Sequence, residues 1–219
     1  MAGGQEGQST PPFGPAEFAA ALDVSRETID RLAIFVALLE KWNPAINLIA
    51  PRDLPNIWRR HILDSAQLLQ LLPEAPPGRS RRIIDLGSGA GFPGLILAIL
   101  GAGEVHLIES DGRKCAFLTE AVRLTGVIAT VHNLRIESVP QKLPKLRADV
   151  IVARGLAPLE KLIDFSMPLI EKNGICLFLK GRNVASELTL AEKNWHMRVE
   201  QLPSRTSEAG VILRIGEIN

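Results

Sequence analysis

The 219-residue sequence contains no tyrosine, and its phenylalanines and tryptophans bring the aromatic content to only 5%. This scarcity argues against a surface on which a row of aromatic rings stacks the bases of single-stranded RNA. Cysteine is also scarce, because only Cys115 and Cys176 occur. Two cysteines far apart in sequence exclude a disulfide framework and a multi-cysteine zinc site, so we predict no metal centre.

Long apolar runs are missing as well. The longest candidate, residues 95–100, is far shorter than the roughly 18 residues that a membrane span needs. The opening residues 1–15 show neither the basic segment nor the apolar segment of a secretory signal. We therefore expect a cytoplasmic protein that does not associate with membranes.

An excess of charge of either sign is absent, because 25 basic and 24 acidic residues leave a net charge of +1. Nucleic-acid-binding proteins usually carry an excess of positive charge, which this chain lacks. A basic face on one part of its surface is still compatible with the balanced net charge. Residues 142–182 hold eight Lys/Arg against four Asp/Glu. Smaller basic clusters occur at residues 59–61, 79–82 and 113–114, and solvated surface is the alternative interpretation for all of them.

The pattern along the chain indicates three parts. Residues 1–14 are rich in Gly, Gln, Ser and Pro, which predicts a disordered tail. We expect residues 15–78 to form a helical extension with three helices. The first covers 15–22, the second runs from the cap Ser25 to the Trp42-Asn43-Pro44 segment, and the third covers 55–72. Residues 73–80, with Pro76-Pro77-Gly78, read as a linker.

From residue 79 to residue 219, strand and helix patterns alternate. Short β-branched or apolar runs predict strands at 82–86, 104–109, 128–131, 149–153, 174–180, near 199 and at 211–215. Helices are predicted at 93–100, 112–124, 157–171 and 183–193. This alternation predicts an α/β fold with a doubly wound, mostly parallel sheet.

A glycine-rich loop follows the first predicted strand, in the sequence Asp85-Leu-Gly87-Ser-Gly89-Ala-Gly91-Phe92-Pro-Gly. Glycines at every second position permit positive φ angles and let a ligand approach the main chain. A dinucleotide fingerprint requires G-x-G-x-x-G, and Phe92 breaks that spacing. The G-x-G-x-G spacing after Asp85 instead resembles the loop of S-adenosylmethionine (SAM) methyltransferases, so Asp85 is a candidate for meeting the ammonium of SAM.

A second carboxylate, Glu109, comes at the end of the second predicted strand. A carboxylate at that position can accept hydrogen bonds from both ribose hydroxyls of an adenosine-containing cofactor. A plain strand–helix turn with an exposed glutamate is the alternative, and the combination of the glycine loop, Asp85 and Glu109 disfavours it.

In several motifs between residues 38 and 182, the chain resembles the bacterial glucose-inhibited-division B family. Members of this family are methyltransferases that act on guanine N7 of 16S ribosomal RNA. The motifs are Lys41-Trp42-Asn43, Asn47-Leu48, Arg60-His61-Ile62-Leu63-Asp64-Ser65, the loop at 85–94, the segment 109–118, Arg135-Ile136-Glu137, Ala153-Arg154 and Lys180-Gly181. The chain departs from the family at Gly155, where the family usually has alanine.

The resemblance implies roles for the matching residues. It implies that Gly87 and Phe92 line the SAM pocket, that Gly89 and Gly91 shape its loop, and that Glu109 holds the ribose. It further implies that Ile136 and Glu137 meet the adenine, and that Arg154 lies beside the methionine carboxylate or the incoming base. A structural ion pair between Arg154 and Glu137 or Asp149 is the alternative. The resemblance implies that the partner is 16S rRNA or the small ribosomal subunit, and that the modified guanine lies in a decoding-region loop. It also implies that the protein is a monomer.

Other residues remain open between structure and function. His61 and Asp64, three residues apart, share a helix face, and they serve either as a packing pair between the extension and the sheet or as RNA contacts. Trp42 and Trp58 are expected in the core. Guanine N7 carries a free lone pair and needs no general base, and the sequence contains neither an (Asn/Asp)-Pro-Pro-aromatic motif nor a Pro-Cys pair. A SAM-binding RNA-interaction module and a small-molecule methyltransferase are the two alternative functions.

Overall fold

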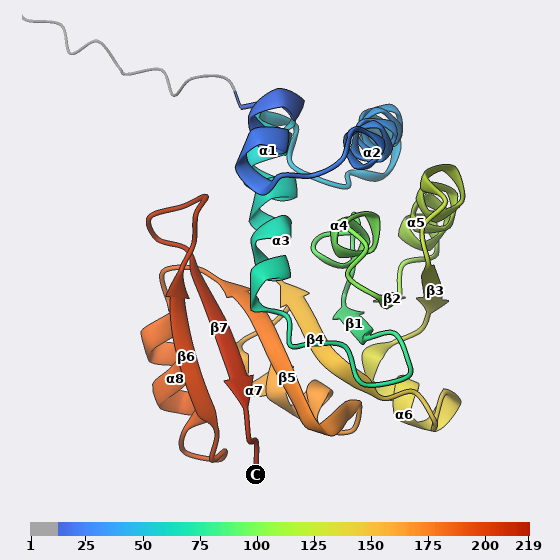
Figure 1. Cartoon of the computed structure of the whole chain (residues 1–219). Helices are drawn as coiled ribbons and strands as arrows, with labels where there is room; N and C mark the ends of the chain where they lie inside the picture. The colour runs from blue at the N-terminus through green and yellow to red at the C-terminus, as the bar shows by residue number, and fades with distance from the viewer. Residues whose placement is uncertain (1–12) are drawn as a thin grey trace, which may run out of the picture.

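The structure, a computed structural model, describes residues 13–219 (Figure 1). Residues 1–12, and with them nearly all of the tail predicted at 1–14, lie outside the described residues. The helical extension begins with α1 (Pro15–Leu22) and α2 (Arg26–Ile46). Ser25 caps α2, as predicted, because its hydroxyl accepts a hydrogen bond from the backbone N–H of Thr28 at 3.2 Å.

The predicted end of α2 at the Trp42-Asn43-Pro44 segment is wrong, because the helix continues through Pro44 to Ile46. Asn43 is buried, and its side-chain amide bonds both the N–H and the carbonyl of Ile49 at 2.9 and 3.1 Å. These local hydrogen bonds hold Asn43 in helical geometry against the steric preference that Pro44 imposes. The helix ends at Asn47, which has a positive φ and donates its N–H to the carbonyl of Asn43.

The predicted helix at 55–72 is a helical path made of four short pieces. They are η1 (Pro51–Asn56) and η3 (Gln67–Leu71), both 3-10 helices, the π-helical η2 (Trp58–Leu63) and the α-helical α3 (Asp64–Ala66). Turns of π-helix occur frequently at functional sites, and this one carries Arg60 and His61. The segment predicted as a linker, 73–80, has no regular structure.

Seven strands form one sheet in the order β3-β2-β1-β4-β5-β7-β6. The strands are β1 (Arg82–Leu86), β2 (Glu104–Glu109), β3 (Ala129–Asn133), β4 (Ala148–Arg154), β5 (Ile170–Lys180), β6 (Arg198–Pro203) and β7 (Val211–Gly216). The first five pair in parallel, and β7 runs antiparallel to both β5 and β6. The prediction of a doubly wound, mostly parallel α/β sheet is confirmed.

The remaining helices connect the strands. They are α4 (Gly94–Ile99), α5 (Gly112–Thr125), η4 (Ile136–Ser138), α6 (Val139–Lys142), α7 (Leu159–Ser166) and α8 (Val184–Ala191). The helix predicted at 157–171 is too long, because α7 ends at Ser166 and β5 already begins at Ile170. Pro168 explains the early end, since a proline cannot donate the next helical hydrogen bond.

Two apolar cores lie on the two faces of the sheet. Alternate residues of a strand point to opposite faces, so Ile83 packs with the extension, α4 and α5, whereas Ile84 and Leu86 pack with α6, α7 and α8. Trp58 lies in the first core and Trp42 packs against it, as predicted. The extension and the sheet therefore share one core. No helix within residues 13–219 is both long enough and apolar enough to cross a membrane.

Candidate functional site

The glycine loop joins β1 to α4 at the carboxyl edge of the sheet. Gly87, Gly89 and Gly91 have φ angles of +66°, +55° and +93°, which confirms the predicted need for glycine in this turn. The loop follows β1, and Arg154 ends the neighbouring strand β4. Strand order reverses between β1 and β4, and open α/β sheets bind ligands in the crevice at such a switch point.

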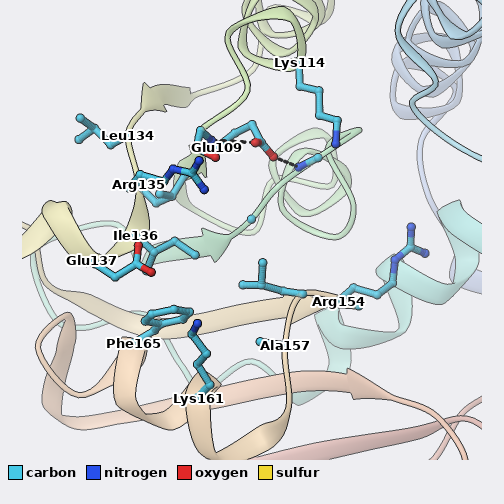
Figure 2. Close-up of a pocket in the computed structure, with 16 residues that line it drawn as sticks. Glu109, Lys114, Leu134, Arg135, Ile136, Glu137, Arg154, Ala157, Lys161 and Phe165 are labelled. Carbon is cyan, nitrogen blue, oxygen red and sulfur yellow. Dashed lines mark hydrogen bonds between the residues drawn. The ribbon is translucent and has the colours of Figure 1, made fainter.

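Glu109 fixes the loop in place from the end of β2. One carboxylate oxygen accepts the N–H of Gly89 at 2.9 Å, and the other accepts those of Ser110 and Asp111 at 2.7 and 2.8 Å (Figure 2). Each carboxylate oxygen has two lone pairs, so Glu109 keeps acceptor capacity after these bonds are made. The carboxylate is 9% exposed and cannot swing away without breaking three backbone hydrogen bonds.

A cavity of about 420 Å³ opens beside the loop, between the carboxyl ends of β1, β2 and β4 (Figure 2). Cavities of this size are typical of sites for small molecules and cofactors. Six residues predicted from the sequence line it: Gly87, Gly89, Glu109, Ile136, Glu137 and Arg154. The structure thus brings residues from four separate loops around one space.

Several lining residues were missed by sequence reasoning. Lys114 belongs to a basic cluster visible in the sequence, but nothing there placed it at the cavity. Leu156, Lys161 and Phe165 carry no motif at all, and they reach the cavity because Gly155 turns the chain back after β4. Basic side chains outnumber acidic ones around the cavity, at Lys114, Arg135, Arg154 and Lys161 against Glu109 and Glu137.

Three predicted residues do not line the cavity: Asp85, Gly91 and Phe92. Gly91 shapes the loop as expected, because an added Cβ would approach Leu95 to 3.0 Å. Asp85 is fully buried beneath the loop, where one carboxylate oxygen accepts the N–H of Gly94 at 3.1 Å and the other has no partner. Burial raises the pKa of Asp85 to about 7. In this structure Asp85 therefore supports the loop from beneath and does not line the cavity.

Phe92 is a correction of the sequence prediction, because its ring belongs to the core and not to the cavity wall. The ring packs edge-on against Phe35, with a 5.5 Å centroid distance, and stacks with His61 at 5.0 Å. The Arg154 guanidinium lies 4.9 Å from the ring centroid, which is within the range of a cation–π contact. Phe92 therefore joins the loop to the helical extension.

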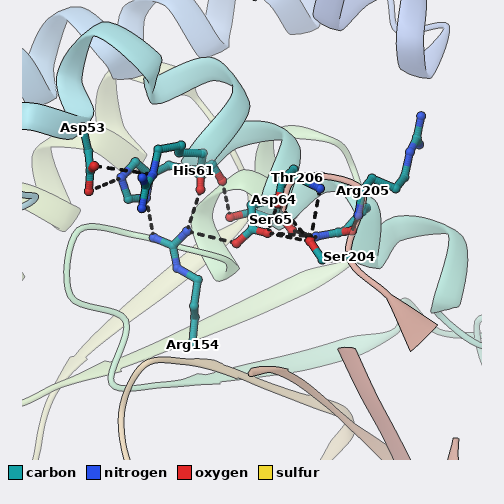
Figure 3. Close-up of polar contacts among 10 residues, drawn as sticks. Asp53, His61, Asp64, Ser65, Arg154, Ser204, Arg205 and Thr206 are labelled. Atoms are coloured by element: carbon teal, nitrogen blue, oxygen red, sulfur yellow. Dashed lines mark hydrogen bonds and ion pairs between the residues drawn. The ribbon is translucent and has the colours of Figure 1, made fainter. Parts of the chain in front are cut away.

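Arg154 pairs with neither Glu137 nor Asp149, the two partners considered from the sequence. Its guanidinium instead contacts His61 Nδ1 at 2.8 Å and Asp64 Oδ2 at 3.4 Å (Figure 3). Asp149 is bound by Arg79 through two hydrogen bonds of 2.7 Å. His61 and Asp64 thus connect the helical extension to the sheet, in agreement with the packing alternative.

The contact with Arg154 fixes the protonation of His61. A guanidinium has only donors, so His61 Nδ1 must carry the lone pair and Nε2 the hydrogen. Nε2 points toward the Asp53 carboxylate, 3.7 Å away. Burial, followed by the charge of Arg154, lowers the pKa of His61 to about 4, so the ring is neutral at pH 7.

Asp64 is held in place by Thr206, from the far end of the chain, and by its neighbour Gln67. Its Oδ1 accepts hydrogen bonds from Thr206 Oγ1 at 2.5 Å and from Gln67 Nε2 at 2.9 Å (Figure 3). Gln67 in turn accepts the backbone N–H of Arg205 at 2.9 Å. The loop between β6 and β7 is thereby fastened to the helical extension.

Lys180, which lies in the basic segment 142–182, has a largely buried side chain. Its side chain is 9% exposed, and its ammonium pairs with Glu187 at 2.5 Å and donates to the carbonyl of Ala157. Arg182 and Arg205, in contrast, are exposed and form no ion pair within the described part of the chain.

Comparison with known proteins agrees with this arrangement. The family of rRNA small subunit methyltransferase G, also called GidB, matches residues 28–210. The chain belongs to this family. The methyltransferase G of Rhodospirillum centenum is 56% identical over 95% of this chain and 93% of its own length, and that of Rhodospirillum rubrum is 51% identical over 94% and 98%. The resemblance seen in the sequence is confirmed.

The fold is shared more widely than the GidB family. The crystal structure of the ribosomal protein L11 methylase from Lactobacillus delbrueckii subsp. bulgaricus superposes with a TM-score of 0.52. The two proteins are 21% identical, and the match covers 69% of this chain and 77% of that one. This likeness shows that the two proteins share the fold of the sheet and its helices.

Proposed function

We propose that this chain transfers a methyl group from SAM to N7 of one guanine in a decoding-region loop of 16S rRNA. Membership of the GidB family supports ribosomal RNA of the small subunit as the substrate class. The observation that carries the proposal is the cavity at the switch point, where Glu109 and the Gly87–Gly91 turn face Arg154.

The residues around the cavity fit the ribose, the adenine and the methionine carboxylate of SAM. Glu109 keeps one lone pair free for a ribose hydroxyl, and its position is fixed by three backbone bonds. The Gly89 main chain is open, since an added Cβ would meet nothing closer than 3.8 Å. Ile136 and Phe165 offer apolar surface for the adenine, and Arg154 is a donor for the methionine carboxylate.

When bound, SAM supplies an electrophilic methyl group on a sulfonium. The N7 lone pair would take up this methyl group, and the electron pair of the former C–S bond would remain on the sulfur. Since N7 carries no proton, the chain contributes alignment and close approach, which can lower a barrier by several kcal/mol. Neither cysteine is suited to covalent attack, because both are buried and burial raises their pKa values.

Other features of the proposal concern the whole protein. We assign residues 15–78 to a helical extension that contributes to RNA binding and residues 79–219 to the methyltransferase domain. We further propose that the protein acts as a monomer in the cytoplasm, on 16S rRNA or on the small subunit into which it is assembled.

Mapping N7-methylguanine in 16S rRNA tests the proposal. RNA from cells with and without the protein is cleaved chemically at N7-methylguanine, and we expect one site to disappear when the protein is missing. Re-expression of the wild-type chain should restore the site, and the Glu109→Ala variant should not, because it lacks the ribose acceptor. An unchanged cleavage pattern, or methyl transfer to small molecules alone, would contradict the proposal.

A further inference from the structure

A second cavity, of about 400 Å³, adjoins the cofactor cavity at the same edge of the sheet. It lies between Asp64 of the helical extension, the Gly181–Arg182 turn after β5, and the loop that joins β6 to β7. Arg154 and Gly155 line both cavities. The two spaces therefore meet at the end of β4.

We propose that the second cavity receives the acceptor guanine and that Asp64 recognises its Watson–Crick edge. This inference rests on the proposed function, because it presumes a guanine substrate. It goes further by assigning a base pocket and the residue that selects guanine within it.

The carboxylate of Asp64 is suited to that edge of guanine. Guanine presents N1–H and N2–H₂ as neighbouring donors, and a single carboxylate oxygen with two lone pairs can accept from both. Thr206 and Gln67 hold Oδ1 at 2.5 and 2.9 Å, whereas Oδ2 has only the 3.4 Å contact to Arg154. Asp64 is thus fixed in orientation and retains acceptor capacity.

The order of groups in space matches the order around the base. Along the guanine perimeter, N2 and N1 are followed by the O6 acceptor and then by N7. In the protein, Asp64 lines the second cavity, Arg154 follows on the shared wall, and the cofactor cavity lies beyond. A base with N1 and N2 on Asp64 and O6 toward Arg154 directs N7 to the cofactor cavity.

The guanidinium of Arg154 is available for O6 at little cost. Its strong bond goes to His61 at 2.8 Å, and its contacts with Asp64 and the Arg60 carbonyl are long, at 3.4 Å each. The guanidinium has five N–H donors, so it can add a bond to the base without releasing His61.

The rim of the second cavity carries cations for the RNA backbone. Arg182 lines the cavity and is exposed, and Arg205 is exposed on the neighbouring loop. The ammonium of Lys180 is already neutralised by Glu187. Arg182 and Arg205 are therefore the side chains expected to meet the phosphates that flank the guanine.

Gly181 allows the cavity to be filled without disturbing the fold. It has no positive φ, and a Cβ added there would meet no atom within 4 Å. We expect Gly181→Leu to bind SAM with wild-type affinity in calorimetry and to lose at least about tenfold in methyl transfer to 16S rRNA. The matched control, Ala185→Leu, places the same side chain on the exposed side of α8 and should retain wild-type activity.

Inosine, which lacks the N2 amino group, tests recognition by Asp64. With the mapped guanine replaced by inosine, the wild-type rate should fall about tenfold or more, the range expected for one good base contact. Asp64→Asn should be slow on guanine and should treat guanine and inosine alike, with unchanged SAM affinity. A purely structural role of Asp64 would lower both rates and preserve their ratio.

Distinct results overturn the inference and the function beneath it. Wild-type transfer by Gly181→Leu, or an undiminished preference of Asp64→Asn for guanine over inosine, would refute the base pocket and leave the methyltransferase intact. A wild-type protein that methylates no guanine of 16S rRNA would refute the proposed function itself. Thermal unfolding of both variants shows whether each is folded. If Asp64→Asn does not fold, the result for Gly181→Leu alone tests the base pocket.

Discussion

Arg154 and His61, 93 positions apart in the sequence, are joined by a 2.8 Å contact between a guanidinium nitrogen and Nδ1 of the imidazole. This contact requires a neutral ring, because an imidazolium would place a proton on Nδ1 and a second positive charge against the guanidinium. One proton on His61 therefore controls how the helical extension is attached to the wall of the cofactor cavity.

The first prediction concerns stability in acid. Unfolded His61 takes up a proton near pH 6.5, whereas in the folded protein its pKa is about 4. The unfolded state then binds more protons between these pH values, so this group makes the folded state less stable as the pH falls from about 6.5 to 4. In urea unfolding at a series of pH values, the stability advantage of wild type over His61→Gln should shrink across that window, by on the order of 2–3 kcal/mol. A difference that does not change with pH would contradict the neutral, buried ring.

Asp85 gives the opposite pH dependence. Its folded pKa of about 7 lies above the ordinary value near 3.9, so the folded state binds more protons between pH 4 and 7. The group then favours folding less as the pH rises through that range. We expect Asp85→Asn to gain stability relative to wild type from pH 4 to pH 8, measured by urea unfolding. Asp164→Asn, at an exposed position, is the control and should show no such trend.

Cofactor binding should depend on the main chain at Gly89. Gly89→Val places a branched side chain where the ligand must approach, so SAM binding in calorimetry should be lost. Gly78→Val is a matched control, because Gly78 also has a positive φ, +78°, with no atom within 4 Å of an added Cβ, and lies in the linker. Both variants carry backbone strain, but only Gly89→Val should lose SAM. Equal affinities would show that the cavity assignment is wrong.

The two thiols should be dispensable for catalysis. Cys176 is fully buried, with its pKa raised to about 12 by burial, and Cys115 donates its S–H to the carbonyl of Glu109 at 3.3 Å. The double variant Cys115→Ser, Cys176→Ala should lose some stability and keep its methyl-transfer rate per folded molecule within a few-fold of wild type. A trapped RNA–protein adduct would instead indicate covalent chemistry on a cytosine.

RNA binding should be sensitive to salt. Contacts between arginine and phosphate release counterions, so the logarithm of the binding constant should fall linearly with the logarithm of salt concentration. Arg182→Glu should weaken binding and reduce the slope by about one. Lys193→Glu, an exposed position beyond the end of α8, should leave the slope unchanged. A binding constant that hardly responds to salt would exclude a basic face as the RNA contact.

The sequence predicted most of the sheet because its strands are short apolar runs between clear turn residues. It predicted Gly87 and Glu109 at the cavity because Gly87 directly follows β1 and Glu109 is the last residue of β2. It placed Phe92 at the cavity, whereas the ring lies in the core. The local sequence is the same whether an aromatic ring next to a ligand loop faces the ligand or packs beneath the loop. Only the contacts of this ring with Phe35 and His61, far away in the chain, decide between the two.

Other failures came from contacts that local patterns do not reveal, some of them between residues far apart in the sequence. Pro44 is a strong local signal for a helix end, and the buried amide of Asn43 overrides it. The partner of Arg154 was sought among carboxylates of the sheet, and it was found in the helical extension. Leu156 and Phe165 have no recognisable pattern, and their place at the cavity follows from the turn at Gly155. Periodicity and motif spacing contain no information about such contacts.

The bond between Thr206 and Asp64 spans 142 positions of the chain, and this has a consequence for biosynthesis. Asp64 leaves the ribosome early, but the hydroxyl that orients it arrives only with the turn between β6 and β7. A partly synthesised chain can build the glycine loop and the first five strands while Asp64 still lacks its partner. The second cavity is therefore among the last parts of the protein to be completed during synthesis.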